Sequence, residues 1–391
     1  MSKADVKMRL TSDFKKRFQR QPEIFLASPG RMEMIGNHTD YNHGLCLAAA
    51  LDFLIEAAIA PTDDMQVVAE SQGTRRIFRV DLNDLAIRKS EFNRTEALIR
   101  GVANGFKTRG YQIGGLQIYA ISDIPRGAGV SSSAAYELLI ASAFNILYND
   151  GKIPPLVLAQ IAQEAEVNYF HKPCGLLDQT SVAFGGLVFL DFASTTVPKV
   201  TKLEFALPGY DLVLVNTGSH SSLTAYYKEA RDDIFKVVSH FGVHSLREIP
   251  LAQFEAELGT LYQKVGGRAI NRAFHVFSEN ERVLQAKVAF EKQDIPTILK
   301  CIRGSGASSL ALLQNLTYPS DTEQGLLLAY NLSLQAFPQG AFRVHGGGFA
   351  GTLLGILPQK QTAAYIAKMS AVFGKENILR IRVRNLGPAL F

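Results

Sequence analysis

The 391-residue chain is predicted to be an α+β protein of two domains. Segments with helical periodicity and short apolar strands both occur along the chain, but they alternate without the regular rhythm of a doubly wound parallel sheet. The length suits two domains that each bury a core of their own. We place the division near residues 195–210, so that the domains cover residues 1–200 and 201–391.

Periodicity and turn residues predict the elements of the first half. The segment Ser28-Pro-Gly30 interrupts an apolar run and is expected to separate two strands. In chain order we expect an amphipathic helix at 3–19, strands at 22–26 and 31–35, an apolar segment of small residues at 45–60, a hairpin at 65–79 that turns at 71–73, a helix at 91–108, a strand at 115–122, a helix that ends at 148, a helix at 154–167 and a loop near 172–175.

The second half is dominated by helices. In chain order we expect strands at 186–191 and 210–216, helices over 222–313 with a long amphipathic one at 279–293, a strand–glycine–strand unit at 343–357, and a closing helix followed by a strand.

Composition excludes several classes of protein. A hydrophobic content of 47% and a charged content of 20% are those of an ordinary globular protein, and no apolar run is long enough to span a bilayer. The net charge of +5 is not gathered into a stripe that would bind nucleic acid. Cys46, Cys174 and Cys301 lack metal-ligand spacing and are expected to be reduced. Because the first residues lack the apolar core of a signal peptide, we expect a cytoplasmic location.

A candidate phosphate-binding loop spans Pro125-Arg-Gly-Ala-Gly-Val-Ser-Ser-Ser133. Its small residues let the backbone turn tightly, and an apolar helix follows directly. A glycine loop that enters a helix N-terminus favours an anion, because unpaired N–H groups and the helix dipole both attract negative charge. The segment has neither a Walker A ending nor the spacing of a Rossmann fingerprint. An ordinary helix cap is equally compatible with these residues.

Polar side chains are concentrated in residues 28–44. Arg31 and Glu33 share one face of a strand, and residues 37–40 (Asn-His-Thr-Asp) follow in a turn. Such a turn offers the directional donors and acceptors that a polyhydroxylated ligand requires. The alternative is an Asx-type turn beside a buried ion pair.

Two carboxylates form a second candidate constellation. Glu166 lies near the end of a predicted helix, and Asp178 follows beyond a loop that contains proline and glycine. Since Asp178 is surrounded in sequence by apolar residues, we expect it to be buried and to need a cationic partner, for which Arg31 is the candidate. A helix cap or a structural salt bridge is the alternative.

A third segment, His345-Gly-Gly-Gly-Phe-Ala-Gly-Thr352, places four glycines between two apolar strands. This composition indicates a close approach of the backbone to another group. Packing against a second backbone and contact with a ligand are weighed equally.

Together these segments are similar, in order and separation, to the three motifs of the galactokinases, a family of the GHMP small-molecule kinases. The motifs are Gly30-Arg…Gly36-x-His-Thr-Asp-Tyr-Asn42, Gly127-x-Gly-x-Ser-Ser-Ser-Ala134 and Gly346-Gly-Gly-Phe-x-Gly351, and residues 163–166 and 174–179 match the same family. The resemblance extends from about residue 22 to the C-terminus. It implies an N-terminal domain resembling ribosomal protein S5 domain 2 and a ferredoxin-like C-terminal domain, with the active site between them.

The resemblance also implies an activity and its residues. The activity is ATP-dependent phosphorylation of galactose at its anomeric hydroxyl, with Asp178 as the catalytic aspartate, Arg31 beside it, and Mg²⁺ held by Ser133 and Glu166. The residues implied for the ATP phosphates are Gly127, Ala128, Gly129, Val130, Ser131, Ser132 and Ser133. Those implied for the sugar are Asn37, His38, Thr39, Asp40, Gly175 and Tyr227. We expect a monomer or a weak homodimer.

The chain departs from the family's pattern at three places. Asn37 stands where the family usually has glutamate, and Glu33 where it usually has asparagine, which would put a carboxylate near Arg31. Alignment leaves open whether Tyr227 or Lys228 faces the sugar. With Lys228 in the pocket, Asn37 and Lys228 together would make the site more positive by about two charges, which would suit a sugar acid such as galacturonate.

Two further alternatives come from other classes of function. Some galactokinase relatives are catalytically weak sensors of sugar and ATP, but the presence of residues 131–133, Glu166, Asp178 and Arg31 favours catalysis. A kinase of a non-sugar substrate such as mevalonate conflicts with the turn at residues 38–40.

Overall fold

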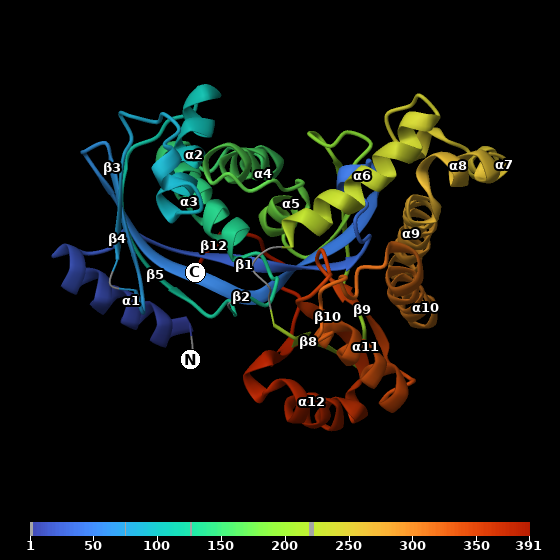
Figure 1. Ribbon diagram of the computed structural model, residues 1–391. Helices are drawn as coiled ribbons and strands as arrows, with labels where there is room; N and C mark the ends of the chain where they lie inside the picture. The colour runs from blue at the N-terminus through green and yellow to red at the C-terminus, as the bar shows by residue number, and fades with distance from the viewer. Residues whose placement is uncertain (1–2, 75, 126, 219–222) are drawn as a thin grey trace.

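The computed structural model describes residues 3–74, 76–125, 127–218 and 223–391, and its strands form two sheets (Figure 1). The first sheet has the order β12-β1-β2-β5-β3-β4, with β6 paired to β2 and β7 paired to β6, and the second has the order β11-β8-β10-β9. The first contains β1 (Ile24–Ile35), β2 (Leu45–Thr62), β3 (Gln66–Ser71), β4 (Ile77–Asp81), β5 (Gly115–Ser122), β6 (Leu187–Asp191), β7 (Lys199–Leu203) and β12 (Ala389–Leu390). The second contains β8 (Tyr210–Asn216), β9 (Ala341–His345), β10 (Thr352–Pro358) and β11 (Ile378–Ile381).

Helices cover both faces of the first sheet (Figure 1). They are α1 (Lys3–Phe18), α2 (Thr95–Thr108), α3 (Ser132–Tyr148), α4 (Pro155–Glu164) and α5 (Leu177–Phe184). Alternate side chains of β2 point to opposite faces: Ala57 and Ile59 join the core with α2, α3 and α4, whereas Ala58 and Ala60 pack against α1. The short helical turns are η1 (Asp40–Asn42), η2 (Lys89–Glu91), η3 (Ala165–Tyr169), η4 (Leu246–Glu248), η5 (Ser309–Leu313) and η6 (Lys375–Asn377).

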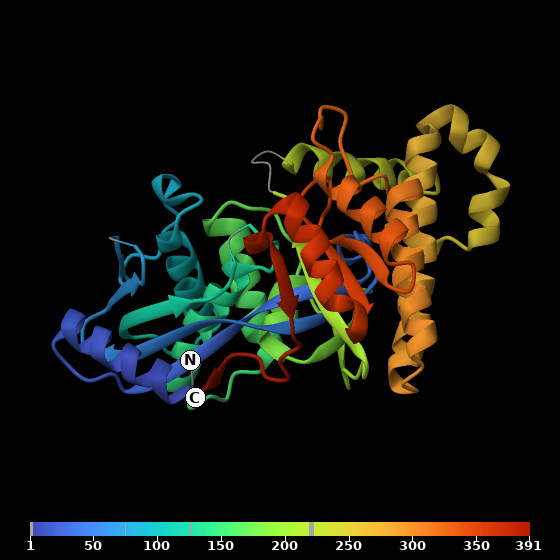
Figure 2. The ribbon, with the colours of Figure 1, turned by 90° about the horizontal axis from the view of Figure 1, so that it is seen from below.

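The second sheet is covered in the same way. Its helices, and those that extend beyond it, are α6 (Thr224–His240), α7 (Leu251–Ala256), α8 (Leu258–Val265), α9 (Gly267–Glu291), α10 (Ile295–Ser308), α11 (Gly325–Ala336) and α12 (Gln359–Phe373). Val213 and Val215 of β8 pack with α11 and α12, while Leu212 and Leu214 belong to the larger core that includes α9 and α10. Helices α6, α7 and α8 form a separate apolar cluster with the start of α9 and project from the sheets (Figure 2).

Most predicted elements are present, and the α+β class is confirmed. The predicted break at Ser28-Pro-Gly30 is wrong: β1 runs through it, because a register shift between Pro29 and Arg31 accommodates the proline. Gly30 also leaves room for the phosphate-loop carbonyl of Val130, which would lie 2.7 Å from a Cβ there. Helix α5 and strand β7 were not expected, and the long helix α9 begins at Gly267 rather than at residue 279.

The two halves of the chain are interleaved at the sheet edges. Strand β12 at the C-terminal end pairs with β1, and Val383 bridges to Leu51, so the chain returns to the first sheet. The division near residues 195–210 therefore stays a prediction. No helix within the described ranges is both long and apolar enough to cross a membrane.

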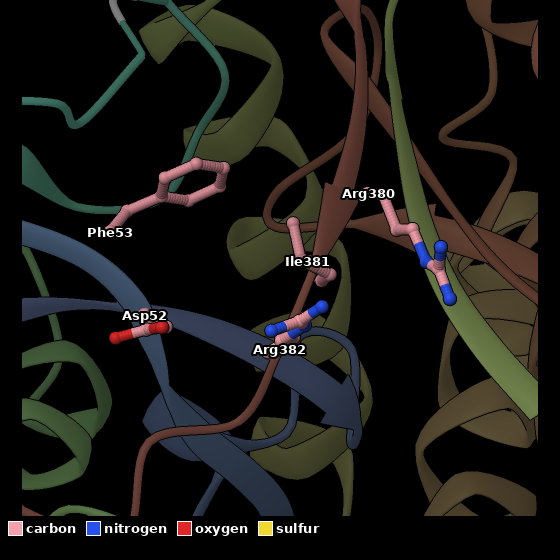
Figure 3. A pocket seen from close by; sticks show the side chains of 5 residues that line it. All are labelled: Asp52, Phe53, Arg380, Ile381 and Arg382. Carbon is pink, nitrogen blue, oxygen red and sulfur yellow. The ribbon is translucent and has the colours of Figure 1, made fainter. Parts of the chain in front are cut away.

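A pocket of about 260 Å³ opens at the junction of β2 and β11. Figure 3 shows its lining: Asp52, Phe53, Arg380, Ile381 and Arg382. None of the predicted site residues that the structure describes belongs to this lining.

Candidate active site

The predicted phosphate loop connects β5 to the N-terminus of α3. Ala128 and Val130 are buried in the core, whereas Gly127, Gly129 and Ser132 are exposed. Gly127, Gly129 and Ser131 have φ values of +74°, +70° and +59°, a conformation that glycine adopts without cost. The loop is thus fixed by its apolar residues and turns its small residues outward at the start of a 17-residue helix. This arrangement suits an anion, as the sequence predicts.

Arg31 and Asp178 lie directly beside this loop. Arg31 Nε donates to Asp178 Oδ1 and Arg31 Nη2 to Oδ2, both at 2.7 Å, and Arg31 Nη1 donates to the Gly129 carbonyl at 2.6 Å. The Ser131 hydroxyl also donates to Asp178. The predicted pairing of the two residues is therefore present, in the two-pronged geometry that arginine forms with carboxylates. Although burial opposes ionisation, Arg31 and Ser131 hold the pKa of Asp178 below its usual value.

Glu166 and Ser133 form a second cluster at the start of α3. Ser133 Oγ donates to Glu166 Oε1 at 2.8 Å, and Lys172 Nζ contacts the same oxygen at 2.7 Å. Gln179 Nε2 donates to Glu166 Oε2 at 2.7 Å and to Glu137 at 3.1 Å. Burial, followed by the charge of Glu166, raises the pKa of Glu137 well above its usual value.

The chemistry of Ser133 and Glu166 fits Mg²⁺, which prefers hard oxygen ligands. The part of the chain that the structure describes contains no group of three or more His, Cys, Asp or Glu residues arranged to hold a metal ion. Two protein oxygens match an ion whose other ligands are phosphate oxygens and water, as is usual for Mg²⁺ bound with a nucleotide.

Two residues of the predicted sugar turn are engaged within the protein. Asn37 has no exposed surface: its Nδ2 donates to Glu33 Oε1 at 3.1 Å and to the Gly346 carbonyl at 2.6 Å, and its Oδ1 accepts from Asn315. Thr39 is equally buried, and its hydroxyl lies 2.7 Å from the carbonyl oxygens of Gly36 and of a β2 residue. The structure therefore places both side chains in the framework of the turn, not on its accessible surface.

His38 and Asp40 lie on the side of the turn that faces the other motifs. His38 Nε2 lies 2.7 Å from the Gly347 carbonyl, and burial lowers its pKa to about 4, so the imidazole is neutral at physiological pH. Asp40 approaches Gly175 so closely that any side chain there would overlap its carboxylate. Burial raises the pKa of Asp40 to about 7, and the carboxylate of Glu33 adds to the shift.

Glu33, the carboxylate that the sequence places near Arg31, pairs with Arg343 instead. Its Oε1 accepts from Arg343 Nη2 at 2.6 Å, and its backbone carbonyl accepts from Arg343 Nη1 at 2.9 Å. Arg31 is already occupied by Asp178, so another buried arginine, Arg343 on β9, neutralises Glu33. The ion pair joins the first sheet to the second.

Helix α6 places Tyr227, not Lys228, against the glycine motif. The Tyr227 ring lies beside Gly347, where a Cβ would meet it at 2.5 Å, and its centroid is 6.2 Å from that of His38. Lys228 is paired with Asp232 one turn further along the helix, and its side chain is 65% exposed. Of the two residues that the sequence left open, Tyr227 therefore lies against the glycine motif, and Lys228 does not add a cation there.

The glycine motif between β9 and β10 contacts both other motifs. Its carbonyl oxygens accept from Asn37 and lie against His38, and Thr352 Oγ1 at its end donates to the Ala128 carbonyl of the phosphate loop at 3.0 Å. The glycines have two other causes: a Cβ at Gly347 or Gly348 would overlap Tyr227 or Asn315, and positive φ values of +71° and +100° favour glycine at positions 346 and 351. The glycine motif and the threonine at its end thus link the turn at residues 37–40 to the phosphate loop, beside which Arg31 lies.

Sequence reasoning missed several residues of this region. Those that hold the turn from distant elements are His275, Glu279, Asn315 and Arg343, and those beside Glu166 are Glu137, Lys172 and Gln179. A signal existed for Glu137, a carboxylate inside the apolar helix α3. The residues that hold the turn carry no local pattern, because their partners lie more than 200 positions away in the sequence.

Comparisons with known proteins identify the family of this chain. Residues 12–61 match the galactokinase galactose-binding signature, and residues 97–186 match the GHMP kinases N-terminal domain. A galactokinase of Thermotoga petrophila is 31% identical over 84% of this chain and 87% of its own, and one of Clostridium tetani is 29% identical over 89% and 87%.

Solved structures share the fold. Lactococcus lactis galactokinase, crystallised with galactose, has a TM-score of 0.84 at 24% identity and covers 99% of this chain and 100% of its own. Methanococcus jannaschii mevalonate kinase has a TM-score of 0.66 at 14% identity, covering 93% and 99%.

Proposed function

The chain belongs to the galactokinase family of the GHMP small-molecule kinases, and from this premise we propose that it transfers the γ-phosphoryl group of ATP to the anomeric hydroxyl of galactose. The observation that carries the proposal is the Arg31–Asp178 pair, because it lies directly against the phosphate loop: Arg31 donates to the Gly129 carbonyl, and the Ser131 hydroxyl donates to Asp178. With the two groups side by side, the carboxylate can contact the sugar hydroxyl while the guanidinium contacts the phosphoryl group.

Asp178 would orient the sugar hydroxyl for in-line attack. The anomeric oxygen forms a bond to the γ-phosphorus while the bond from that phosphorus to the bridging oxygen of ADP breaks. Because the pKa of Asp178 lies below its usual value, the carboxylate is ionised and accepts the hydroxyl's hydrogen bond. It receives the proton as the oxygen–phosphorus bond forms and then passes it to solvent.

Arg31 would stabilise negative charge on the transferring group. Two of its nitrogens hold Asp178 and a third holds the Gly129 carbonyl, so the guanidinium is fixed before substrate binds. Fixed donors stabilise developing charge without a cost of reorganisation. Mg²⁺, held by Ser133 and Glu166, would neutralise charge on the phosphates of the nucleotide.

Asp40, His38, Gly175 and Tyr227 remain the proposed sugar-binding residues. The free thiols of Cys46, Cys174 and Cys301 support a reducing compartment such as the cytoplasm. A monomer or a weak homodimer is the proposed state.

The proposal is tested by ADP release from the purified protein with ATP, Mg²⁺ and a panel of sugars: galactose, galacturonate, N-acetylgalactosamine, glucose and arabinose. We expect galactose to give the highest kcat/KM, with galacturonate well below it because Lys228 lies outside the site. Binding of ATP and galactose without ADP release would indicate a sensor and would overturn the proposal.

The rate should depend on pH through Asp40. Its pKa of about 7 means that the carboxyl is protonated below that value and ionised above it, and only the ionised form accepts hydrogen bonds with both oxygens. We therefore expect kcat/KM for galactose to rise with pH through about 7. The rise should vanish in Asp40→Asn, a control that separates this group from titration of the nucleotide. A rise that persists unchanged in Asp40→Asn would contradict the assignment.

Tyr227 and Lys228 should behave differently on substitution. Tyr227→Ala removes a ring that packs on the glycine motif and on His38, so we expect KM for galactose to increase roughly three- to tenfold. Lys228→Ala removes only an exposed ion pair with Asp232 and should leave KM for galactose and for galacturonate unchanged. Steady-state kinetics of both variants check this. A specific loss of galacturonate turnover in Lys228→Ala would show that Lys228, not Tyr227, faces the sugar.

A further inference from the structure

Lys172 places a positive charge on the proposed metal ligand. Its Nζ lies 2.7 Å from Glu166 Oε1, the same oxygen that accepts from Ser133 Oγ at 2.8 Å. The side chain of Glu166 is 1% exposed, whereas that of Lys172 is 52% exposed. The ammonium group therefore reaches inward from the protein surface to the carboxylate and the hydroxyl that would ligate Mg²⁺.

The other oxygen of Glu166 is already occupied. Its Oε2 accepts from Gln179 Nε2 at 2.7 Å and contacts Cys174 Sγ at 3.3 Å. A metal ion that binds between Ser133 and Glu166 must consequently take the position of the Lys172 ammonium. Gln179 can remain in place and keep the carboxylate oriented during the exchange.

This inference rests on the proposed function. We propose that the Lys172 ammonium occupies the metal position when nucleotide is absent and moves to the phosphates when Mg²⁺ and ATP bind. We call Lys172 in the first of these positions the resident cation. The lysine can move because its side chain is half exposed, so that its ammonium group can be solvated as it leaves Glu166. An ammonium on a flexible stem with three rotatable donors can follow a phosphate group.

The exchange would couple entry of the metal to entry of the nucleotide. Without nucleotide, the lysine repels a divalent ion and satisfies Glu166, so free metal binds weakly. With nucleotide, the phosphates attract both cations, and the lysine adds to the positive charge that Arg31 already supplies. Lys172 would then contact the phosphates directly and contribute to catalysis.

Binding of Mn²⁺, measured by electron paramagnetic resonance, tests whether Lys172 occupies the metal position, and this measurement needs no turnover. In the nucleotide-free protein, Lys172→Met should bind Mn²⁺ about tenfold tighter than the wild type, since a unit charge in contact shifts a neighbouring equilibrium by roughly one to three log units. Lys172→Arg should bind as weakly as the wild type. Lys152→Met is the matched control, because Lys152 pairs with Asp150 at 3.0 Å on the surface, where both side chains are 79% exposed.

Steady-state kinetics with ATP test whether Lys172 moves to the phosphates. Lys172→Met should raise KM for MgATP or lower kcat by about tenfold, while Lys152→Met should change neither. Thermal unfolding of each variant verifies that it is folded. Equal Mn²⁺ affinity in wild type and Lys172→Met overturns the proposal. Tighter Mn²⁺ binding with unchanged kinetics overturns the movement to the phosphates. If the wild type phosphorylates no sugar but Lys172→Met still binds Mn²⁺ more tightly, the proposed function is wrong and the position of the resident cation is confirmed.

Discussion

Asp178→Asn should lower kcat for galactose by about 10³-fold and leave the fold intact. The amide has nearly the same shape as the carboxylate and sits in the first turn of α5, but it cannot receive the proton of the sugar hydroxyl. Arg31→Ala should lower kcat by a similar factor or more, because one arginine directed at a transferring phosphoryl group is worth about 10³- to 10⁵-fold.

Single-turnover kinetics and ligand binding separate chemistry from affinity in these variants. We expect the dissociation constant for galactose to change far less than kcat in Asp178→Asn. Circular dichroism and thermal unfolding serve as controls for structure, since Arg31 is a buried partner in the pair. Folded variants of Asp178 and Arg31 with near-normal kcat would remove both residues from the mechanism.

Arg343→Met should lower the free energy of unfolding by about 3–5 kcal/mol, because it leaves the buried Glu33 carboxylate without its cation. The Arg343 side chain has no exposed surface, and besides Glu33 it contacts Ser305 Oγ on α10 at 3.1 Å. Its loss would therefore weaken the joint between β1 of the first sheet and β9 of the second. Urea unfolding at neutral pH measures the effect.

A matched control exists on the surface. Arg88 pairs with Asp84 at the same distance of 2.6 Å, but the two side chains are 42% and 51% exposed. Arg88→Met leaves no buried charge and should therefore lower the free energy of unfolding far less than Arg343→Met. The double variant Glu33→Gln with Arg343→Met should be more stable than Arg343→Met alone, since no uncompensated charge remains. Equal losses in Arg343→Met and Arg88→Met would show that burial does not decide the strength of the Arg343–Glu33 pair.

Much of the fold and part of the site could be predicted from local sequence. The phosphate loop was recognisable because small residues, serines and an apolar helix follow one another directly. The Arg31–Asp178 pair was predictable because a carboxylate among apolar residues needs a partner and few cations lie in comparable surroundings. Both predictions depend on residue types whose chemistry restricts where they can lie, because small residues permit a tight turn and a buried carboxylate needs a cation.

The rest depended on distant contacts. The burial of Asn37 is decided by Asn315 and by the glycine motif, which lie some 300 positions away in the chain and leave no mark on the turn's own sequence. The choice between Tyr227 and Lys228 depends on helical phase, because neighbouring helix residues point about 100° apart. The apolar residues Ala230, Ile234 and Val237 share the face of Tyr227 at helical spacing, so this phase could have been found from the sequence of α6.

The central claim is that the Arg31–Asp178 site phosphorylates galactose at its anomeric hydroxyl. The most direct test is ³¹P–¹H correlation spectroscopy of the product that the purified protein forms from ATP, Mg²⁺ and galactose, with Asp178→Asn run in parallel. We predict one new phosphomonoester coupled to the anomeric proton, formed by the wild type and reduced about 10³-fold in rate by the variant. A phosphate coupled to any other proton of the sugar, or equal product from both proteins, would contradict the account.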